Sequence, residues 1–124
     1  WLRAGQLPPE TVRDLTTRLL DRIESGTVDA DGIGPPFDAL VLSELVRTDR
    51  VAPHFPDALR SRVARTAVAW FEGIRDYRGY DDTIGWRHGV AHGADWLMQL
   101  ALNPAYGREE LAAMRRALLS QVRA

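Results

Sequence analysis

The sequence predicts an all-α protein. Apolar residues recur at helical spacing in five successive segments, and no segment shows the alternation typical of a half-buried strand. Short connections separate the segments, so consecutive helices are expected to run antiparallel. The pattern fits either a small bundle or an array of HEAT-like helical hairpins, and no internal repeat decides between them.

Proline and glycine define most of the helix ends. Pro8-Pro9 precedes the first apolar stripe and Gly26 follows it, while Asn103-Pro104 ends the fourth helix. The glycine, aspartate and proline of residues 26–36 predict a loop. The five helices are expected between Pro8 and Gly26, and over about 37–48, 56–75, 84–102 and 107–122. In the last of them, Leu111, Met114, Leu118 and Val122 are expected to fall on one apolar stripe.

Composition excludes several classes of function. The chain has 124 residues, which suits one domain spanning 1–124, and its formal net charge of −1 argues against nucleic acid as a partner. No apolar run reaches the roughly 18 residues of a membrane span, and we expect a cytoplasmic protein. Cysteine and lysine are both absent, which excludes disulfides, thiolate chemistry and Schiff bases. Because the chain starts at Trp1, we expect it to be a fragment of a longer one.

One stretch, RGYDDTIGWRHGVAHGADW at residues 78–96, differs from the amphipathic helices around it. If residues 84–102 are helical, His88, His92 and Asp95 fall on one narrow polar stripe together with Gln99. The expected apolar face lies on the opposite side and consists of Trp86, Val90, Ala94, Leu97 and Ala101.

Metal binding is the most concrete chemistry that this stripe allows. Two histidines at i and i+4 can chelate one divalent ion, and Asp95 would be the third ligand. The glutamate of the H-E-x-x-H motif is missing, since position 89 is glycine. A metal-dependent hydrolase would therefore take its general base from elsewhere, and Asp81 is the candidate.

Two other interpretations remain open beside the hydrolase. The leading one is a module that binds a small molecule or a protein through a polar cluster, and the other is a purely structural hydrogen-bonded network. The residues of the binding cluster are Arg78, Asp81, Trp86, His88, His92 and Asp95. Gly85, Gly89 and Gly93 favour a close approach to the helix, because each interior glycine costs up to ~1 kcal/mol relative to alanine. Another helix or a bound molecule would explain them equally well.

The turn before the fourth helix also allows a structural interpretation. Asp82 or Thr83 is placed to cap the helix, and Arg78 is expected to pair with Asp76 or Asp81. His54 stands between two prolines and is expected to be a surface residue.

The segment DYRGYDDTIGWRHGVAHGADWL closely resembles the signature of DUF2785, a bacterial family of uncharacterised proteins. The matching residues are Asp76, Arg78, Gly79, Tyr80, Gly85, Trp86, His88, Ala91, His92, Gly93, Ala94, Asp95 and Leu97. FDALVLSELVRTD is similar to an earlier helix of the family, although Asp38 stands where a serine is expected. The resemblance covers about residues 10–104. It implies a HEAT-like helical fold and a His–His–Asp stripe shared by the family, and it supplies no activity.

Overall fold

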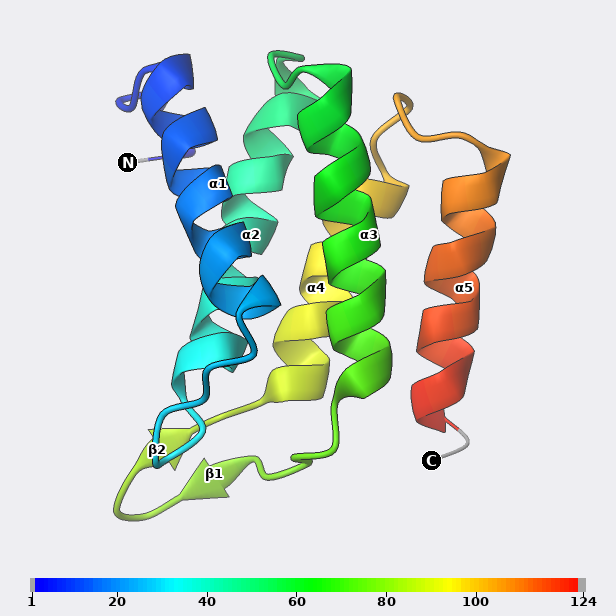
Figure 1. Cartoon of the computed structure of the whole chain (residues 1–124). Helices are drawn as coiled ribbons and strands as arrows, with labels where there is room; N and C mark the ends of the chain where they lie inside the picture. The colour runs from blue at the N-terminus through cyan, green and yellow to red at the C-terminus, as the bar shows by residue number, and fades with distance from the viewer. Residues whose placement is uncertain (1, 123–124) are drawn as a thin grey trace.

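The computed structural model describes residues 2–122, and it confirms the all-α prediction. Five helices account for most of the chain, and a hairpin of two short strands joins the third helix to the fourth (Figure 1). The elements are α1 Pro9–Glu24, α2 Gly34–Val51, α3 Asp57–Gly73, β1 Tyr80–Asp81, β2 Gly85–Trp86, α4 Gly89–Ala101 and α5 Arg108–Val122.

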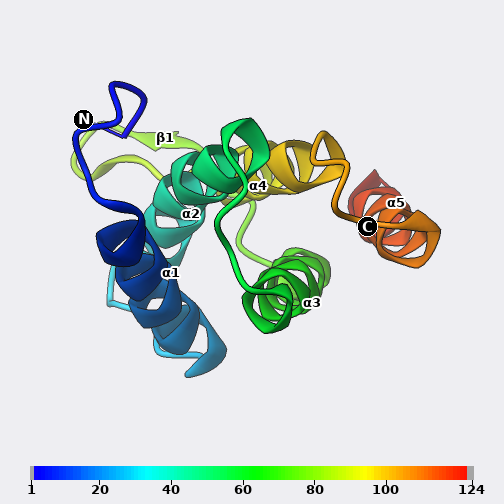
Figure 2. The same cartoon turned by 90° about the horizontal axis from the view of Figure 1, so that it is seen from above.

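The helices alternate between two layers. Figure 1 shows α1, α3 and α5 side by side in front of α2 and α4, and the view from above in Figure 2 separates the same two rows. The most extensive packing lies between α2 and α4 within the rear layer. Of the two rear helices, α4 packs on both α3 and α5 of the front layer, whereas α2 packs on α1.

Proline begins the first three helices as the sequence predicts. Pro8 is the N-cap of α1, Pro56 is the N-cap of α3, and the first turn of α2 contains a proline. The start of α2 is also held by Asp29, whose carboxylate accepts hydrogen bonds from the backbone N–H groups of Ile33 and Gly34. The first helix ends at Glu24, just before Gly26, which adopts a positive φ of 71°.

The core lies between the two layers. Its fully buried large side chains come from four helices and include Leu20, Leu42, Leu45, Val63, Phe71, Trp96, Leu97 and Leu100. Gly93 of α4 faces α3 so closely that a Cβ atom there would lie 2.5 Å from Phe71 Cδ2 and 3.0 Å from Trp70 Cζ3. Of the two explanations for this glycine, the structure therefore supports close packing of another helix.

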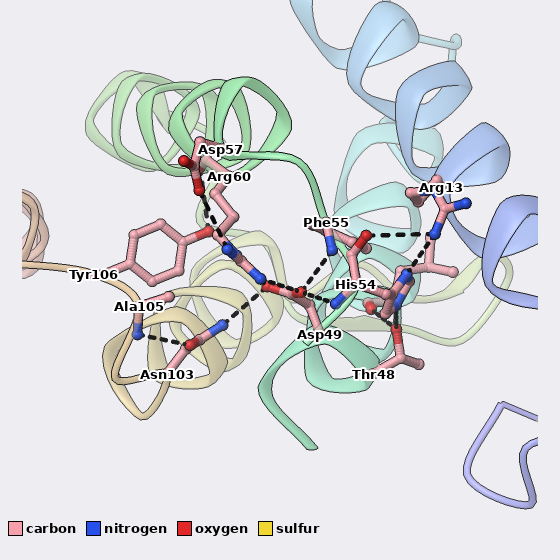
Figure 3. A network of polar contacts seen from close by, with 11 residues as sticks. Arg13, Thr48, Asp49, His54, Phe55, Asp57, Arg60, Asn103, Ala105 and Tyr106 are labelled. Atoms are coloured by element: carbon pink, nitrogen blue, oxygen red, sulfur yellow. Dashed lines mark hydrogen bonds and ion pairs between the residues drawn. The ribbon is translucent and has the colours of Figure 1, made fainter. Parts of the chain in front are cut away.

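A buried carboxylate joins the far ends of α2, α3 and α4 (Figure 3). The Asp49 side chain is 1% exposed and accepts hydrogen bonds from the backbone N–H groups of His54 and Phe55, both at 2.8 Å. The Arg60 guanidinium donates through Nε at 2.8 Å and Nη2 at 2.9 Å, and Asn103 Nδ2 donates at 3.1 Å. A fully paired carboxylate of this kind fixes the loop between α2 and α3 against the end of α4.

His54 belongs to the same network, so its expected place on the surface is wrong. Arg13 Nη1 lies 3.2 Å from His54 Nδ1, and Thr48 Oγ1 lies 2.9 Å from Nε2. Because arginine can only donate, Nδ1 must accept and Nε2 must carry the proton. Burial lowers the pKa of His54, and the charges of Arg13 and Arg60 lower it further against the opposite effect of Asp49. His54 is therefore a neutral structural residue.

One sequence expectation about the helices is wrong. The fourth helix begins at Gly89 rather than near residue 84, because residues 80–86 form the hairpin. The apolar stripe predicted on the last helix is largely unburied. Met114 is buried, whereas Leu111, Leu118 and Val122 are exposed.

Candidate functional site

The hairpin places the middle of the 78–96 motif outside any helix. Tyr80 pairs with Trp86 and Asp81 with Gly85 in antiparallel register. Asp81 Oδ1 accepts the backbone N–H groups of Thr83 and Ile84, at 2.9 and 3.0 Å, and so closes the turn. These two hydrogen bonds lower the pKa of Asp81. The predicted helix cap by Asp82 or Thr83 is therefore wrong. Asp81 acts as a cap instead, and it caps the hairpin turn rather than the start of the helix.

Two arginines hold the hairpin in place: Arg78 pairs within the connection from α3, and Arg87 reaches the loop before α2. Arg78 donates to both carboxylate oxygens of Asp76, from Nε at 2.7 Å and from Nη2 at 2.5 Å. Arg78 thereby lowers the pKa of Asp76 to about 2. Of the two partners expected for Arg78, the structure selects Asp76.

Arg87 is the second anchor, and the sequence interpretation missed it. It is 4% exposed, its Nε donates to the carbonyl of Asp31 at 2.7 Å, and its backbone N–H donates to the carbonyl of Gly79 at 3.0 Å. An arginine within a polar motif gives no sequence signal of burial, since arginine is usually a surface residue. Arg87 links the hairpin to the loop that precedes α2.

Five rings form a continuous row from the hairpin to the first turn of α2, and we call them the aromatic row. In spatial order they are Tyr80, Trp86, His88, His92 and Phe37. Successive ring centroids are 4.8, 4.4, 6.1 and 5.9 Å apart, and the Trp86 and His88 rings are stacked with 19° between their planes.

The row is open to solvent at both ends. Tyr80 is 59%, Trp86 54% and Phe37 42% exposed, whereas His88 and His92 are half-buried. Trp86 was expected on the apolar face of a helix, and this expectation is wrong because it lies in β2. Phe37, in the first turn of α2, is the exposed ring at the other end of the row.

His88 has a strained backbone. As the N-cap of α4 it adopts φ 51° and ψ 45°, and no other non-glycine residue within residues 2–122 has a positive φ. A residue with a Cβ atom pays roughly 1–2 kcal/mol for this left-handed conformation. The strain places the imidazole directly against the face of Trp86.

The three predicted metal ligands have different surroundings. His88 and His92 stand edge to face, and Asp95 is exposed further along α4. Within residues 2–122, no group of three or more His, Cys, Asp or Glu residues could hold a metal ion. The histidine spacing thus remains a prediction of metal binding that the arrangement of the side chains does not favour.

Electrostatics keep His92 uncharged near neutral pH. Burial lowers its pKa, and the neighbouring His88 lowers it further, while Asp95 acts in the opposite direction. A neutral imidazole can both donate and accept a hydrogen bond. Gln99, the fourth member of the predicted stripe, is buried instead, and its Oε1 accepts a hydrogen bond from Arg50 Nε at 3.0 Å.

The fold and this surface define an all-α protein of antiparallel helical hairpins with an aromatic row at one end. The family model described as "Protein of unknown function (DUF2785)" matches residues 33–124. The chain therefore belongs to the DUF2785 family. The matched segment starts after the expected residue 10 and continues past residue 104 to the end of the chain. No curated protein and no solved structure matches the chain.

None of the five helices within residues 2–122 combines the length and the apolar composition needed to cross a membrane.

Proposed function

We propose that this protein is a binding module and that the aromatic row is the surface through which it holds a protein partner. The single observation that carries the proposal is the row itself, with Tyr80, Trp86 and Phe37 each more than two-fifths exposed. Tryptophan and tyrosine are the residue types most enriched among the few that dominate protein interfaces. Exposing three such rings in one contiguous row costs solvation free energy unless a partner covers them.

The row also offers unused hydrogen-bonding groups. Within residues 2–122, the Tyr80 hydroxyl, the Trp86 indole N–H and the imidazoles of His88 and His92 take part in no hydrogen bond. An aromatic surface with free polar atoms is suited to recognition, because its rings bury apolar area while its polar atoms set the orientation of the partner.

The shape of the surface favours a macromolecule over a small ligand. Small-molecule pockets usually enclose most of the ligand. A cavity at the start of α4 holds about 160 Å³ and is lined by residues such as Pro36, Ile74, Asp76 and Gly89, with none of the five rings among them. A partner that lies across the row therefore fits better than a molecule enclosed by it.

Charge indicates which side chains the partner presents. Asp81 and Asp82 lie at the hairpin turn beside Tyr80, and the lowered pKa of Asp81 keeps its carboxylate ionised. The nearby cation of Arg78 is already paired with Asp76. Arginine or lysine side chains can form ion pairs with these two carboxylates and stack on the rings. The proposed partner is thus a protein segment that combines basic and apolar residues.

The two-layer alternation of the helices supports a HEAT-like helical-hairpin interpretation as part of this proposal. In such arrays each hairpin packs only on its neighbours, and the connections between helices form extended binding edges. The hairpin of residues 80–86 lies on one of these edges (Figure 1).

The test is a selection from a phage-displayed peptide library, followed by affinity measurements on the enriched peptides. We expect the protein to enrich peptides rich in arginine and apolar residues. Tyr80→Ala with Trp86→Ala should weaken their binding by about 30-fold or more, the effect of losing an interface residue worth ~2 kcal/mol. The matched control is Val51→Ala, which removes an exposed apolar side chain of α2 outside the row.

Two outcomes would overturn the proposal. One is that the double variant and the natural sequence enrich the same peptides with equal affinity. The other is that the natural sequence enriches no peptide over the double variant. Circular dichroism of both proteins would verify that the substitutions leave the helices intact.

A further inference from the structure

The hairpin of α4 and α5 carries an exposed apolar face that no part of residues 2–122 covers. On α5, Leu111 and Leu118 are each 41% exposed and Val122 is 81% exposed. With about 100° per residue, these three side chains fall within about 40° of one another on the helix. Met98 of α4 is 47% exposed, and Leu102, the C-cap residue of α4, is 58% exposed. A face of this kind on two adjacent helices marks an interaction surface.

This face is separate from the aromatic row. His92 of α4 contacts Phe37 of α2 and Gln99 accepts from Arg50 of α2, so that flank of α4 is occupied. Gly93 faces α3 on the inner side. Around the helix axis, Met98 lies about 100° from Gln99 and about 140° from Gly93, on the outer side. In Figure 2, α5 lies at the end of the molecule opposite α1, and α4 lies between α2 and α5.

Charges of opposite sign border the two edges of the face. Asp95 is exposed on the α4 edge and Arg115 on the α5 edge, and neither forms an ion pair within residues 2–122. The two helices run antiparallel from their short connection. At 1.5 Å per residue, Asp95 lies about 9 Å below the end of α4, and Arg115 lies about 10 Å below the start of α5. The two charges are therefore level with each other on opposite edges.

We propose that this face binds the same face of a second copy of the chain, so that two α4–α5 hairpins form an antiparallel four-helix bundle. A two-fold axis parallel to the helices places α4 of one copy beside α5 of the other, and every neighbouring pair of helices is then antiparallel. The axis preserves height along the helices. Asp95 of each copy consequently meets Arg115 of its partner, and the leucines of α5 are buried at the centre.

The size of the face sets the strength of the dimer. Two helices about 20 Å long and about 10 Å apart present a patch of roughly 20 by 20 Å. Two such patches bury roughly 800 Å² in total, which is below the roughly 1,200–2,000 Å² of stable interfaces and typical of a weak dimer, so we expect dissociation in the micromolar range. The second copy is favoured over an unrelated partner because its charges already match those on the face.

Analytical ultracentrifugation from about 1 to 300 μM tests the proposal, and this range brackets a micromolar dissociation constant. We expect the mass to rise from 13.9 kDa towards twice that value. Leu118→Glu should leave a monomer at every concentration. Asp95→Arg and Arg115→Asp should each weaken the dimer by about tenfold or more, and the two together should restore it. Val51→Glu, at an even more exposed apolar site on α2, should change nothing.

A chain that stays at 13.9 kDa at 300 μM overturns the proposal and assigns the face to a different partner. A dimer that survives Leu118→Glu, or that the charge exchange does not restore, overturns it by placing the interface elsewhere. Because neither Tyr80 nor Trp86 lies on this face, failure here leaves the proposed binding function intact, and the reverse also holds.

Discussion

Replacing Asp49 with asparagine should destabilise the protein more than any other substitution of similar size. Oδ1 accepts from the N–H groups of His54 and Phe55 and from Arg60 Nη2, while Oδ2 accepts from Arg60 Nε and Asn103 Nδ2. An amide would turn an NH₂ group towards the donors of Arg60 and Asn103. It would also leave the Arg60 guanidinium, whose side chain is only 18% exposed, without its buried counter-charge. Breaking a buried pair in this way costs about 3–5 kcal/mol.

Urea unfolding followed by circular dichroism measures this cost. A domain of this size is stable by only about 5–15 kcal/mol, so Asp49→Asn should shift the midpoint strongly. The control is Asp14→Asn, which removes the same charge from the exposed Arg18–Asp14 pair and should cost less than ~1 kcal/mol. If Asp49→Asn changes the free energy of unfolding by less than about 1 kcal/mol, the network does not hold the ends of the helices as argued.

The same variant has a pH signature. Burial raises the pKa of Asp49, but the hydrogen bonds from Arg60, Phe55 and His54 outweigh burial and bring the pKa below its ordinary value. A carboxyl whose folded pKa lies below the unfolded value of about 3.9 stabilises the fold above that pH and loses this contribution as pH falls. The difference in stability between the natural sequence and Asp49→Asn should therefore narrow below about pH 4. If the difference in stability between the two proteins stays constant down to pH 3, the pKa of Asp49 is not lowered in the folded state.

Two further predictions concern the core. Gly93→Ala should lower the free energy of unfolding, because overpacking against Phe71 costs about 1–3 kcal/mol and the gain in helix propensity returns at most ~1 kcal/mol. The control is Gly73→Ala, because a Cβ atom at Gly73 would meet no other atom within 4 Å. Gly73→Ala should leave the thermal stability unchanged or raise it. If both variants change the stability equally, Gly93 is not needed for the close packing of α4 on α3. Asp38→Asn should raise stability at pH 7, because burial raises the pKa of Asp38 and the exposed Arg22 compensates only in part. The raised pKa in the folded state makes the natural sequence gain stability as pH falls. The difference in free energy of unfolding between Asp38→Asn and the natural sequence should therefore shrink in acid, and a difference that grows in acid would contradict this explanation.

Helix number and approximate position could be predicted from the sequence because prolines and glycines mark helix ends locally. Pro8, Pro56 and Gly26 act through their own backbone geometry, so their effect does not depend on tertiary contacts. Asp76, the observed partner of Arg78, was one of the two partners that the sequence predicted, because both residues lie in the same short turn.

The start of α4 could not be predicted in the same way. Strands of two residues are too short to show alternation, and Trp86 and Val90 at helical spacing mimic an amphipathic helix. The hairpin depends on the Asp81 turn and on Arg87 reaching the carbonyl of Asp31, which is 56 residues away. Contacts at such separation leave no periodic trace in the sequence.

Periodicity also failed to separate buried from exposed apolar stripes. Leu111, Leu118 and Val122 have the spacing of a buried face, although they are exposed. Such spacing indicates that a helix is amphipathic, but it does not identify the neighbour that covers its apolar side. The structure supplies no such neighbour within residues 2–122. An apolar stripe that is correctly spaced and still exposed is thus evidence about association rather than an error of pattern.

Local rules are broken most clearly at His88, and this violation bears on function. Asparagine or glycine would take the left-handed conformation at lower cost, yet a histidine stands there, stacked on Trp86 and edge to face with His92. Backbone strain that is not required by packing tends to be retained where a side chain must be held in one orientation. Trp86 on one side and His92 on the other are both parts of the exposed row. The residue that the backbone disfavours is therefore the one that makes the row continuous.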